Sequence, residues 1–322
     1  MSFASLALGS YPTPVRRLVT PWGAGRELWL KDDGLTSPLY GGNKVRKLEL
    51  ILADATERGA RQVVTFGAAG SHHVYATARY ALTLGLSVRA VLFPQPSSPA
   101  VEEMLRATLA SGADCTPSYE LPRGIKSMLD RRSYLIPPGG SSPLGARGYV
   151  EAGLELGRQV RAGELPEPDE VVVAVGSGGT AAGLAVGLEQ AGLRSRVVAA
   201  PVMQPHRIAQ VLVRLLARLT RGGWRGHRPV VMDAAHTGKG YGWPSASAQE
   251  AVELGRKNGL LLDPTYTEKA FATAVGRLAP AHEQRHLKQR VLYWHTLSSC
   301  APLGPGPEST LPPRFRRLLT ST

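Results

Sequence analysis

The stretch VVVAVGSGGTAAGLAVGLEQ, residues 171–190, decides the fold of this chain. The pattern predicts a buried β-strand, a glycine-rich turn and a helix rich in alanine and leucine. On both sides of it, apolar β-branched runs alternate with segments of helical periodicity, which predicts an α/β fold of parallel sheets flanked by helices. The other expected strands are residues 26–33, 61–67, 87–93, 133–138 and 196–202, and the expected helices are 42–60, 71–85, 100–111, 145–162 and 181–192.

Composition limits the class of protein. The hydrophobic fraction of the 322 residues is 43%, and no apolar run reaches the ~18–20 residues that cross a bilayer, so no membrane partner is expected. The first residues carry no basic stretch before the apolar ones, so no secretion signal is expected. Cys115 and Cys300 can form neither a disulfide framework nor a metal site, which favours a cytoplasmic location.

The net charge of +13 could mark a nucleic-acid or anionic-surface partner. The basic excess is densest between Arg194 and Arg228, in a segment with few aromatic residues for base stacking, so no nucleic-acid partner is expected. Binding of an anionic surface stays open as an alternative. The segment also predicts an amphipathic helix with its apolar side toward the core. Its arginines are Arg207, Arg214, Arg218 and Arg221, and its apolar stripe is Ile208, Val211, Leu212, Leu215 and Leu219.

The glycine-rich turn at residues 176–180 suits a phosphate group, because its backbone N–H groups and the following helix N-terminus attract anions. The string GSGGTA also matches the dinucleotide fingerprint G-x-G-x-x-A. That fingerprint requires an acidic residue about 20 positions later to hold a ribose, and none lies between Glu189 and Asp233. A monophosphate group therefore fits better than a dinucleotide, and a purely structural turn is the alternative.

A lysine lies on the apolar side of the helix that begins in GGNKVRKLE, residues 41–49. Lys44 is one turn before Leu48, on the stripe that continues through Ile51, Leu52 and Ala55. Burial of an ammonium group lowers its pKa, which makes the amine a nucleophile suited to a Schiff base. The alternative is a lysine whose charged end reaches solvent at the start of the helix.

Polar side chains also follow the strand that ends before GAAGSHH, residues 67–73, at the edge where open α/β sheets bind ligands. Ser71 could simply cap the helix. The adjacent histidines do not share a helix face, so no metal site is expected.

Two tyrosines lie near turns in the last third of the chain. Thr265 and Glu268 have the spacing of a capping box, which would place Tyr266 in the first turn of a helix. Tyr241 lies in the sharp turn GYGWP, residues 240–244. Either tyrosine could be ordinary packing.

Taken together, these segments resemble the family of D-cysteine desulfhydrase and 1-aminocyclopropane-1-carboxylate deaminase, which are tryptophan-synthase-β-like (fold type II) pyridoxal-phosphate enzymes. The resemblance covers roughly Pro12 to Thr296 and is most specific in residues 41–49. It implies two α/β domains with pyridoxal 5'-phosphate between them. The larger domain would comprise residues 1–47 and 151–322 and the smaller one residues 48–150, with the Pro/Gly-rich stretch 136–145 as a crossing. The segments that carry the resemblance are GGNKVRKLE, GAAGSHH, PPGGSSPLGARGYVEAGLEL, VVVAVGSGGTAAGL, GYGWP, LLDPTYTEKA and VLYWHT.

The resemblance also implies roles for single residues. Lys44 would hold the cofactor as a Schiff base, and Lys47 and the turn at 176–180 would bind its phosphate. The implied catalytic residues are Lys44, Ser71, Tyr241 and Tyr266, and the implied substrate-binding residues are Ser71, His72, His73, Tyr241 and Tyr266. The implied cofactor-binding residues are Asn43, Lys44, Lys47, His72, Gly176, Ser177, Gly178, Gly179, Thr180 and Thr296, the last as partner of the pyridine nitrogen.

The chain departs from the family's pattern at two places. His72 stands where the family has an asparagine that helps to bind the phenolic oxygen of the cofactor and the substrate carboxylate. Histidine titrates near pH 6.5, so we expect a pH dependence in the neutral range. Leu297 and Ser298 replace two glycines after Thr296. Thr267 stands where the deaminase has glutamate, which makes the desulfhydrase the nearer match.

The expected function is therefore β-elimination from a small amino acid such as D-cysteine, giving an α-keto acid and ammonia. Both lyase and hydrolase are expected enzyme classes. The alternatives are ring opening of 1-aminocyclopropane-1-carboxylate and a non-catalytic cofactor- or anion-binding protein. The expected partners are the small amino-acid substrate and a second copy in a homodimer.

Overall fold

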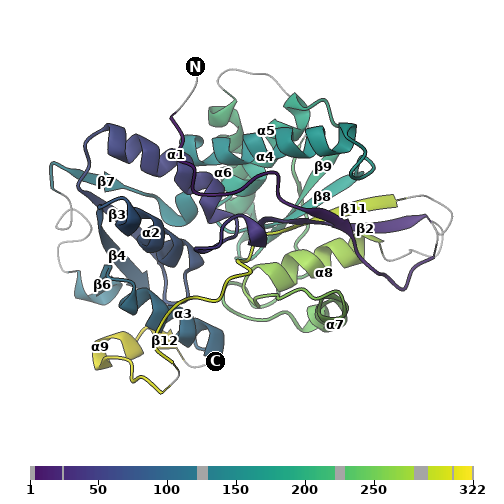
Figure 1. Cartoon of the computed structure of the whole chain (residues 1–322). Helices are drawn as coiled ribbons and strands as arrows, with labels where there is room; N and C mark the ends of the chain where they lie inside the picture. The colour runs from purple at the N-terminus through teal and green to yellow at the C-terminus, as the bar shows by residue number, and fades with distance from the viewer. Residues whose placement is uncertain are drawn as a thin grey trace.

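The computed structural model describes residues 4–23, 25–121, 130–221, 229–278, 289–306 and 308–320. Two sheets organise the chain (Figure 1). The larger has the strand order β1-β2-β11-β8-β9-β10, and every neighbouring pair is parallel except β1 with β2. Its strands are β1 (Val15–Arg17), β2 (Arg26–Asp32), β8 (Glu170–Val175), β9 (Arg196–Pro201), β10 (Val231–Met232) and β11 (Gln289–His295).

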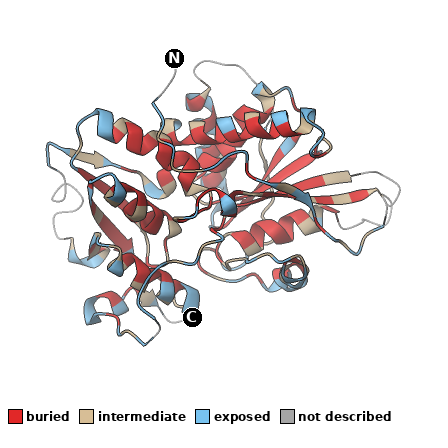
Figure 2. Cartoon of the chain, in the orientation of Figure 1, coloured by how far each residue is buried: buried red, intermediate tan, exposed pale blue. Residues whose placement is uncertain are grey.

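Helices cover both faces of this sheet (Figures 1 and 2). Alternate residues of β8 explain why: Val171 and Val173 pack in one apolar cluster with helices α4, α5 and α6, whereas Val172 and Ala174 pack in another with α7 and α8. A strand that is buried on both faces is apolar throughout, as in residues 171–175. The helices are α4 (Pro143–Arg161), α5 (Gly179–Gln190), α6 (His206–Thr220), α7 (Gln249–Lys257) and α8 (Thr267–Leu278).

The smaller sheet has the order β6-β4-β3-β7, and all its strands are parallel. Helices α1, α2 and α3 pack against it through the apolar faces that the sequence predicts, with Leu48, Ile51 and Leu52 of α1 buried. The elements are α1 (Lys44–Glu57), β3 (Gln62–Ala68), α2 (His72–Thr83), β4 (Ser87–Phe93), α3 (Pro99–Ala110), β6 (Asp114–Pro117) and β7 (Ser133–Leu135). The α/β prediction is confirmed.

The end of the chain returns to the smaller sheet (Figure 1). Strand β12 (Leu319–Thr320) pairs in parallel with β5 (Gln95–Pro96), and Phe315 of the short helix α9 (Pro313–Arg316) joins an apolar cluster that includes Leu92 of β4. The domain boundaries at residues 48 and 150 remain a prediction, and the returning tail lies against the part of the chain that they assign to the smaller domain.

Helix α5 packs against α4 at unusually short range. Its residues from Gly179 to Leu188 are all buried, and a Cβ added at Gly183 would lie 2.2 Å from the carbonyl oxygen of Ala146. Glycine is required there because the two backbones nearly touch. The glycine-rich turn before α5 is thereby held against the core of the larger sheet.

Helix α6 is turned differently from the expected orientation. The stripe Ile208, Val211, Leu212, Leu215 and Leu219 was expected to face the core, but all five side chains are exposed, Val211 by 62%. The buried side consists of Ala209, Val213, Leu216, Ala217 and Thr220, and all of these except Leu216 are smaller than leucine. Val213 lies against the turn, because a Cβ at Gly178 would meet its Cγ2 at 3.1 Å. Small side chains let α6 approach the turn, so they face inward.

Candidate functional site

A cavity of about 700 Å³ opens where strands of both sheets end. Ser71 follows β3 of the smaller sheet, whereas Gly176 follows β8 and Thr296 follows β11 of the larger. The carboxyl ends of parallel strands are where α/β sheets bind ligands. All residues expected in the site line this one cavity: Asn43, Lys44, Lys47, Ser71, His72, His73, Gly176, Ser177, Gly178, Gly179, Thr180, Tyr241, Tyr266 and Thr296.

Lys44 is the first residue of α1, and its amine lies in the cavity. Its Nζ donates to Oδ1 of Asn43 at 2.5 Å. Burial lowers the pKa of Lys44 to about 8, although the carboxylate of Asp263 acts in the opposite direction. No acidic side chain of the described residues forms an ion pair with it. The amine is therefore partly unprotonated near neutral pH and able to act as a nucleophile.

Lys47 lies one turn further along α1 and is only 3% exposed. Its Nζ donates to the carbonyl of Gly139 at 3.0 Å and to the hydroxyl of Ser141 at 3.4 Å. Burial, and then the nearby charge of Lys44, hold the pKa of Lys47 well below its ordinary value. A buried ammonium without a carboxylate partner is costly, so an anion in the cavity would stabilise it.

The glycine-rich turn faces Lys47. Gly178 precedes α5 with φ of +91°, and the N–H of Gly179 donates to Oγ of Ser141 at 3.2 Å. The same hydroxyl lies 2.7 Å from Oγ of Ser177. A Cβ at Gly179 would be 2.7 Å from Ser141 Oγ and 3.1 Å from Lys47 Nζ, so only glycine leaves this space free. Backbone N–H groups, two hydroxyls and the amine of Lys47 together offer the kinds of hydrogen-bond donor that a phosphate group requires.

The smaller sheet contributes Ser71 and two histidines. Oγ of Ser71 accepts the N–H of Val74 at 3.3 Å, so Ser71 caps α2 and also lines the cavity. Nδ1 of His72 lies 2.6 Å from the hydroxyl of Tyr40. Nε2 of His73 lies 2.9 Å from Oγ1 of Thr65, and burial holds the pKa of His73 well below its ordinary value.

The two tyrosines, Tyr241 and Tyr266, contact each other where they line the cavity. The hydroxyl of Tyr266 donates to that of Tyr241 at 3.3 Å, and the two rings are nearly perpendicular. The expected capping box is wrong. Helix α8 begins at Thr267, and Asp263 performs the capping by accepting the N–H groups of Tyr266 at 2.8 Å and Thr267 at 3.1 Å. Tyr266 therefore lies just before the helix, where it reaches the cavity.

The segment after Thr296 supports the start of α1. The N–H of Asn43 donates to the carbonyl of Thr296 at 3.2 Å, and the N–H of Gly41 donates to Oγ of Ser298 at 2.9 Å. Gly42 has φ of +89°, and a Cβ there would lie 2.6 Å from the Thr296 carbonyl. Ser298 therefore anchors the turn that precedes Lys44, and the bulk expected behind Thr296 is accommodated.

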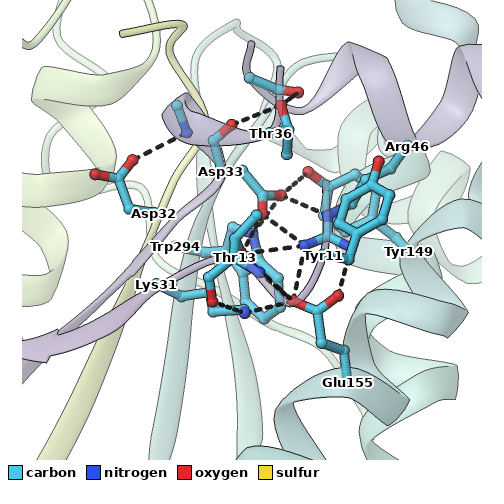
Figure 3. A network of polar contacts seen from close by, with 12 residues as sticks. Tyr11, Thr13, Lys31, Asp32, Asp33, Thr36, Arg46, Tyr149, Glu155 and Trp294 are labelled. Carbon is cyan, nitrogen blue, oxygen red and sulfur yellow. Dashed lines mark hydrogen bonds and ion pairs between the residues drawn. The ribbon is translucent and has the colours of Figure 1, made fainter. Parts of the chain in front are cut away.

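A buried network of ion pairs and hydrogen bonds holds the first turn of α1 in place (Figure 3). Arg46 donates to both oxygens of Asp33 and of Glu155, at 2.9–3.0 Å. Lys31 adds a second cation 2.5 Å from Glu155. Tyr149 and Trp294 also donate to Asp33, at 2.6 and 2.8 Å. Arg46 lies between Lys44 and Lys47 in the sequence, so the network determines where both amines stand.

Sequence reasoning missed three residues that the structure brings to the site. Ser141 lies in the Pro/Gly-rich crossing and contacts both Lys47 and the turn before α5. Asp263 lines the cavity, and its position before a proline and a helix is a typical capping signal that the Thr265–Glu268 spacing obscured. Tyr40 carries no local signal, because its contact with His72 joins residues 32 positions apart.

Comparison with known proteins gives consistent matches. A family profile described as pyridoxal-phosphate dependent enzyme matches residues 6–296. The D-cysteine desulfhydrase of Klebsiella pneumoniae (strain 342) is 34% identical over 315 residues, covering 91% of this chain and 94% of the relative. The D-cysteine desulfhydrase of Salmonella paratyphi B is 36% identical over 293 residues, covering 84% and 87%. The expectation of a hydrolase is wrong, because desulfhydration is a lyase reaction.

Solved structures agree with these matches. The crystal structure of an ACC deaminase homologue superposes with a TM-score of 0.77 at 30% identity, covering 93% of each chain. A fungal L-serine ammonia-lyase from Rhizomucor miehei reaches a TM-score of 0.64 at 17% identity, covering 92% of this chain and 95% of the other, which shows a common fold alone.

Proposed function

This chain belongs to the family of pyridoxal-phosphate dependent enzymes, and we propose from that premise that it is a lyase that removes sulfide from D-cysteine. Its class, a pyridoxal-phosphate dependent lyase or deaminase, follows from the family and its relatives. D-cysteine is the proposed substrate because two relatives that span most of the chain are D-cysteine desulfhydrases. The balanced reaction converts D-cysteine and water into pyruvate, ammonia and hydrogen sulfide.

The residues of the cavity fit the two ends of pyridoxal phosphate. Lys47, Ser141, Ser177 and the N–H groups of the turn before α5 suit its phosphate, because they offer donors and an otherwise unpaired buried charge. At the other end, Lys44 offers an amine with a lowered pKa, which suits a Schiff base with the aldehyde of the cofactor. Thr296 lines the same cavity and is the proposed partner of the pyridine nitrogen.

Bound at this site, the cofactor supplies an electron sink for charge that develops at the substrate α-carbon. The amine of Lys44 is proposed to take the proton from that carbon, since its lowered pKa lets it exchange protons near neutral pH. Ser71, Tyr241 and Tyr266 are proposed to orient the substrate or to carry a proton to the departing sulfur. Burial holds the pKa of both tyrosines above its ordinary value, so both hydroxyls keep their protons as donors.

One observation supports this proposal most strongly: the half-buried Lys44 and the buried Lys47 line one cavity beside the glycine-rich turn, and neither forms an ion pair with a carboxylate among the described residues. The test compares the wild-type protein, Lys44→Ala and the control Lys257→Ala. Lys257 is an exposed lysine of α7 that lies near Glu253. We expect an absorbance band near ~410–430 nm, typical of a cofactor bound covalently to lysine, in the wild-type and control proteins alone.

Product analysis tests the substrate. Sulfide and pyruvate are measured with D-cysteine and L-cysteine, and ammonia with 1-aminocyclopropane-1-carboxylate. We expect sulfide from D-cysteine and none with Lys44→Ala. Ammonia from the cyclopropane substrate alone would replace the desulfhydrase proposal by the deaminase. A fully active Lys44→Ala protein would contradict both.

We also propose that the protein is a homodimer of cytoplasmic location. Three exposed apolar side chains of α6 that do not line the cavity, Ile208, Val211 and Leu219, support a dimer, because a second copy would remove them from water. Light scattering at micromolar concentration tests it, and Val211→Glu is expected to yield monomers.

Among the described residues, no helix combines the length and apolar character that a bilayer crossing requires. We keep the predicted two domains, with residues 308–320 reassigned to the smaller one because β12 and Phe315 pack there.

A further inference from the structure

Tyr40 lies behind the cavity and is fixed on several sides. The side chain is only 2% exposed and packs edge-on against Tyr75, with ring centroids 4.7 Å apart. Its carbonyl accepts the hydroxyl of Tyr80 at 2.8 Å, and Gly41 and Gly42 follow it in the turn before α1. A residue held in this way can hold its own partner in a defined position.

That partner is His72, the first residue of α2. Nδ1 of the imidazole lies 2.6 Å from Oη of Tyr40, and the two ring planes are within 13° of parallel. The ring lines the cavity together with Lys44 and Asp263. Because Nδ1 is occupied by Tyr40, the hydrogen-bonding capacity that remains for a ligand is that of Nε2.

The position of the proton follows from the partners. Burial, opposed by the carboxylate of Asp263 and reinforced by the charge of Lys44, lowers the pKa of His72, so the imidazole is neutral at neutral pH. Among the described residues, Tyr40 Oη has no acceptor other than Nδ1. Burial raises the pKa of Tyr40, so the hydroxyl keeps its proton and donates it to Nδ1. A neutral imidazole that accepts at Nδ1 carries its hydrogen on Nε2.

We propose that Tyr40 is a positioning residue that fixes His72 as the Nε2–H tautomer, so that His72 offers the cavity a single hydrogen-bond donor for an anionic oxygen of the bound cofactor or substrate. The donor role rests on the proposed function, whereas the tautomer does not. The alternative tautomer, with hydrogen on Nδ1, would leave Nε2 as an acceptor and repel such an oxygen.

The test is Tyr40→Phe, with Tyr75→Phe as a matched control. Each substitution removes one hydroxyl from a buried ring, but the hydroxyl of Tyr75 contacts Leu303 rather than His72. Nitrogen-15 NMR of the imidazoles distinguishes a nitrogen that carries hydrogen from one that does not, and His72→Asn assigns the signals. We expect hydrogen on Nε2 of His72 in the wild-type protein and in Tyr75→Phe, and a mixture of tautomers in Tyr40→Phe.

Two binding measurements then identify the oxygen. If it belongs to the cofactor, Tyr40→Phe weakens pyridoxal-phosphate binding about tenfold and leaves the KM for D-cysteine unchanged. If it belongs to the substrate carboxylate, KM rises about tenfold and cofactor binding is unchanged. The proposal is overturned if wild-type His72 carries hydrogen on Nδ1 or on both nitrogens at pH 7.5, or if Tyr40→Phe changes neither signal nor affinity. The wild-type spectrum tests the tautomer of His72 even where Tyr40→Phe fails to fold. Its outcome is independent of the Lys44 test.

Discussion

Arg46 of α1 donates to both carboxylate oxygens of Asp33, from Nε to Oδ2 at 3.0 Å and from Nη2 to Oδ1 at 2.9 Å. Asp33 follows β2 of the larger sheet, whereas α1 packs on the smaller one. This bidentate pair, which Figure 3 shows, therefore joins the larger sheet to the helix that packs on the smaller one.

Asp33→Asn is expected to destabilise the protein by roughly 3 kcal/mol, because it leaves buried donors of Arg46 without their charged partner. Glu155 still accepts hydrogen bonds from Arg46, so the variant is expected to remain folded despite this loss of stability. Urea unfolding followed by circular dichroism measures the change. The control is Glu253→Gln, which breaks an exposed, solvent-screened pair with Arg256 and should leave stability nearly unchanged. Equal losses in both variants would contradict a special role for the buried pair.

Acid should weaken the protein through the same network. Burial alone would raise the pKa of Asp33 and of Glu155, but the cations Arg46 and Lys31 outweigh it and hold both values below the ordinary 3.8 and 4.5. The folded state therefore binds these protons less readily than the unfolded state. The stability they add is complete above about pH 5 and is lost as the pH falls through the folded-state values. Urea midpoints between pH 3 and 6 should fall less steeply in Asp33→Asn than in the wild type.

Lys47→Ala is expected to weaken cofactor binding by about 10–100-fold while leaving the absorbance band of bound cofactor in place. The physical reason is that Lys47 supplies charge to the proposed phosphate site, whereas Lys44 supplies the reactive amine. Titration of the apoprotein with pyridoxal phosphate measures the dissociation constant. A band lost from Lys47→Ala at saturating cofactor would mean that the two lysines have been assigned the wrong way round.

Gly183→Ala is expected to destabilise the protein by about 1–3 kcal/mol, because the new methyl group would meet the backbone of α4 rather than a movable side chain. Gly276→Ala in α8 is the matched control. A Cβ there would lie 3.4 Å from the nearest atom, and alanine favours a helix by up to about 1 kcal/mol. Thermal unfolding should therefore separate the two variants in opposite directions.

The pH dependence expected from His72 must be revised. An ordinary histidine would titrate in the neutral range, but burial lowers the pKa of His72, with Asp263 opposing and Lys44 adding to the shift. As long as this shift persists beside the bound cofactor, protonation of His72 should affect cofactor absorbance only below about pH 6.5. Absorbance titrations of the wild type and His72→Asn are expected to coincide above pH 7 and to diverge in acid. Divergence confined to pH 7–9 would contradict a lowered pKa.

Local pattern predicted most of the secondary structure and the start of the site. Lys44 was identifiable because its spacing from Leu48 places it on an apolar stripe, and the turn at 176–180 was identifiable because glycines follow a strand. Tyr40 and Ser141 were not, because their roles depend on contacts with His72 and Ser177, which lie 32 and 36 positions away in the sequence. Sequence spacing carries no record of such contacts.

Helix α6 shows a different limit of periodicity. Its pattern correctly predicts an amphipathic helix on which Arg207, Arg214 and Arg218 are exposed, although Arg221 is mostly buried and pairs with Glu189. The pattern also assigns the larger apolar residues to the core. The buried side is selected by fit to Gly178 and α5, and small residues such as Ala209 and Val213 satisfy that fit. Hydrophobicity alone therefore selects the wrong face of the helix as the buried one, because the close approach of backbones decides which face packs inward.

The strand order of the larger sheet has a consequence for synthesis on the ribosome. Strand β11, residues 289–295, is the last strand of that sheet to be synthesised. It lies between β2 and β8, at the centre of the sheet. Until it emerges, β2 and β8 each present an unpaired edge, which is a risk for aggregation. Because the pairing of β2 with β11 waits for residues some 260 positions later, completion of this sheet should be slow and late, and the nascent chain should depend on chaperones until β11 inserts.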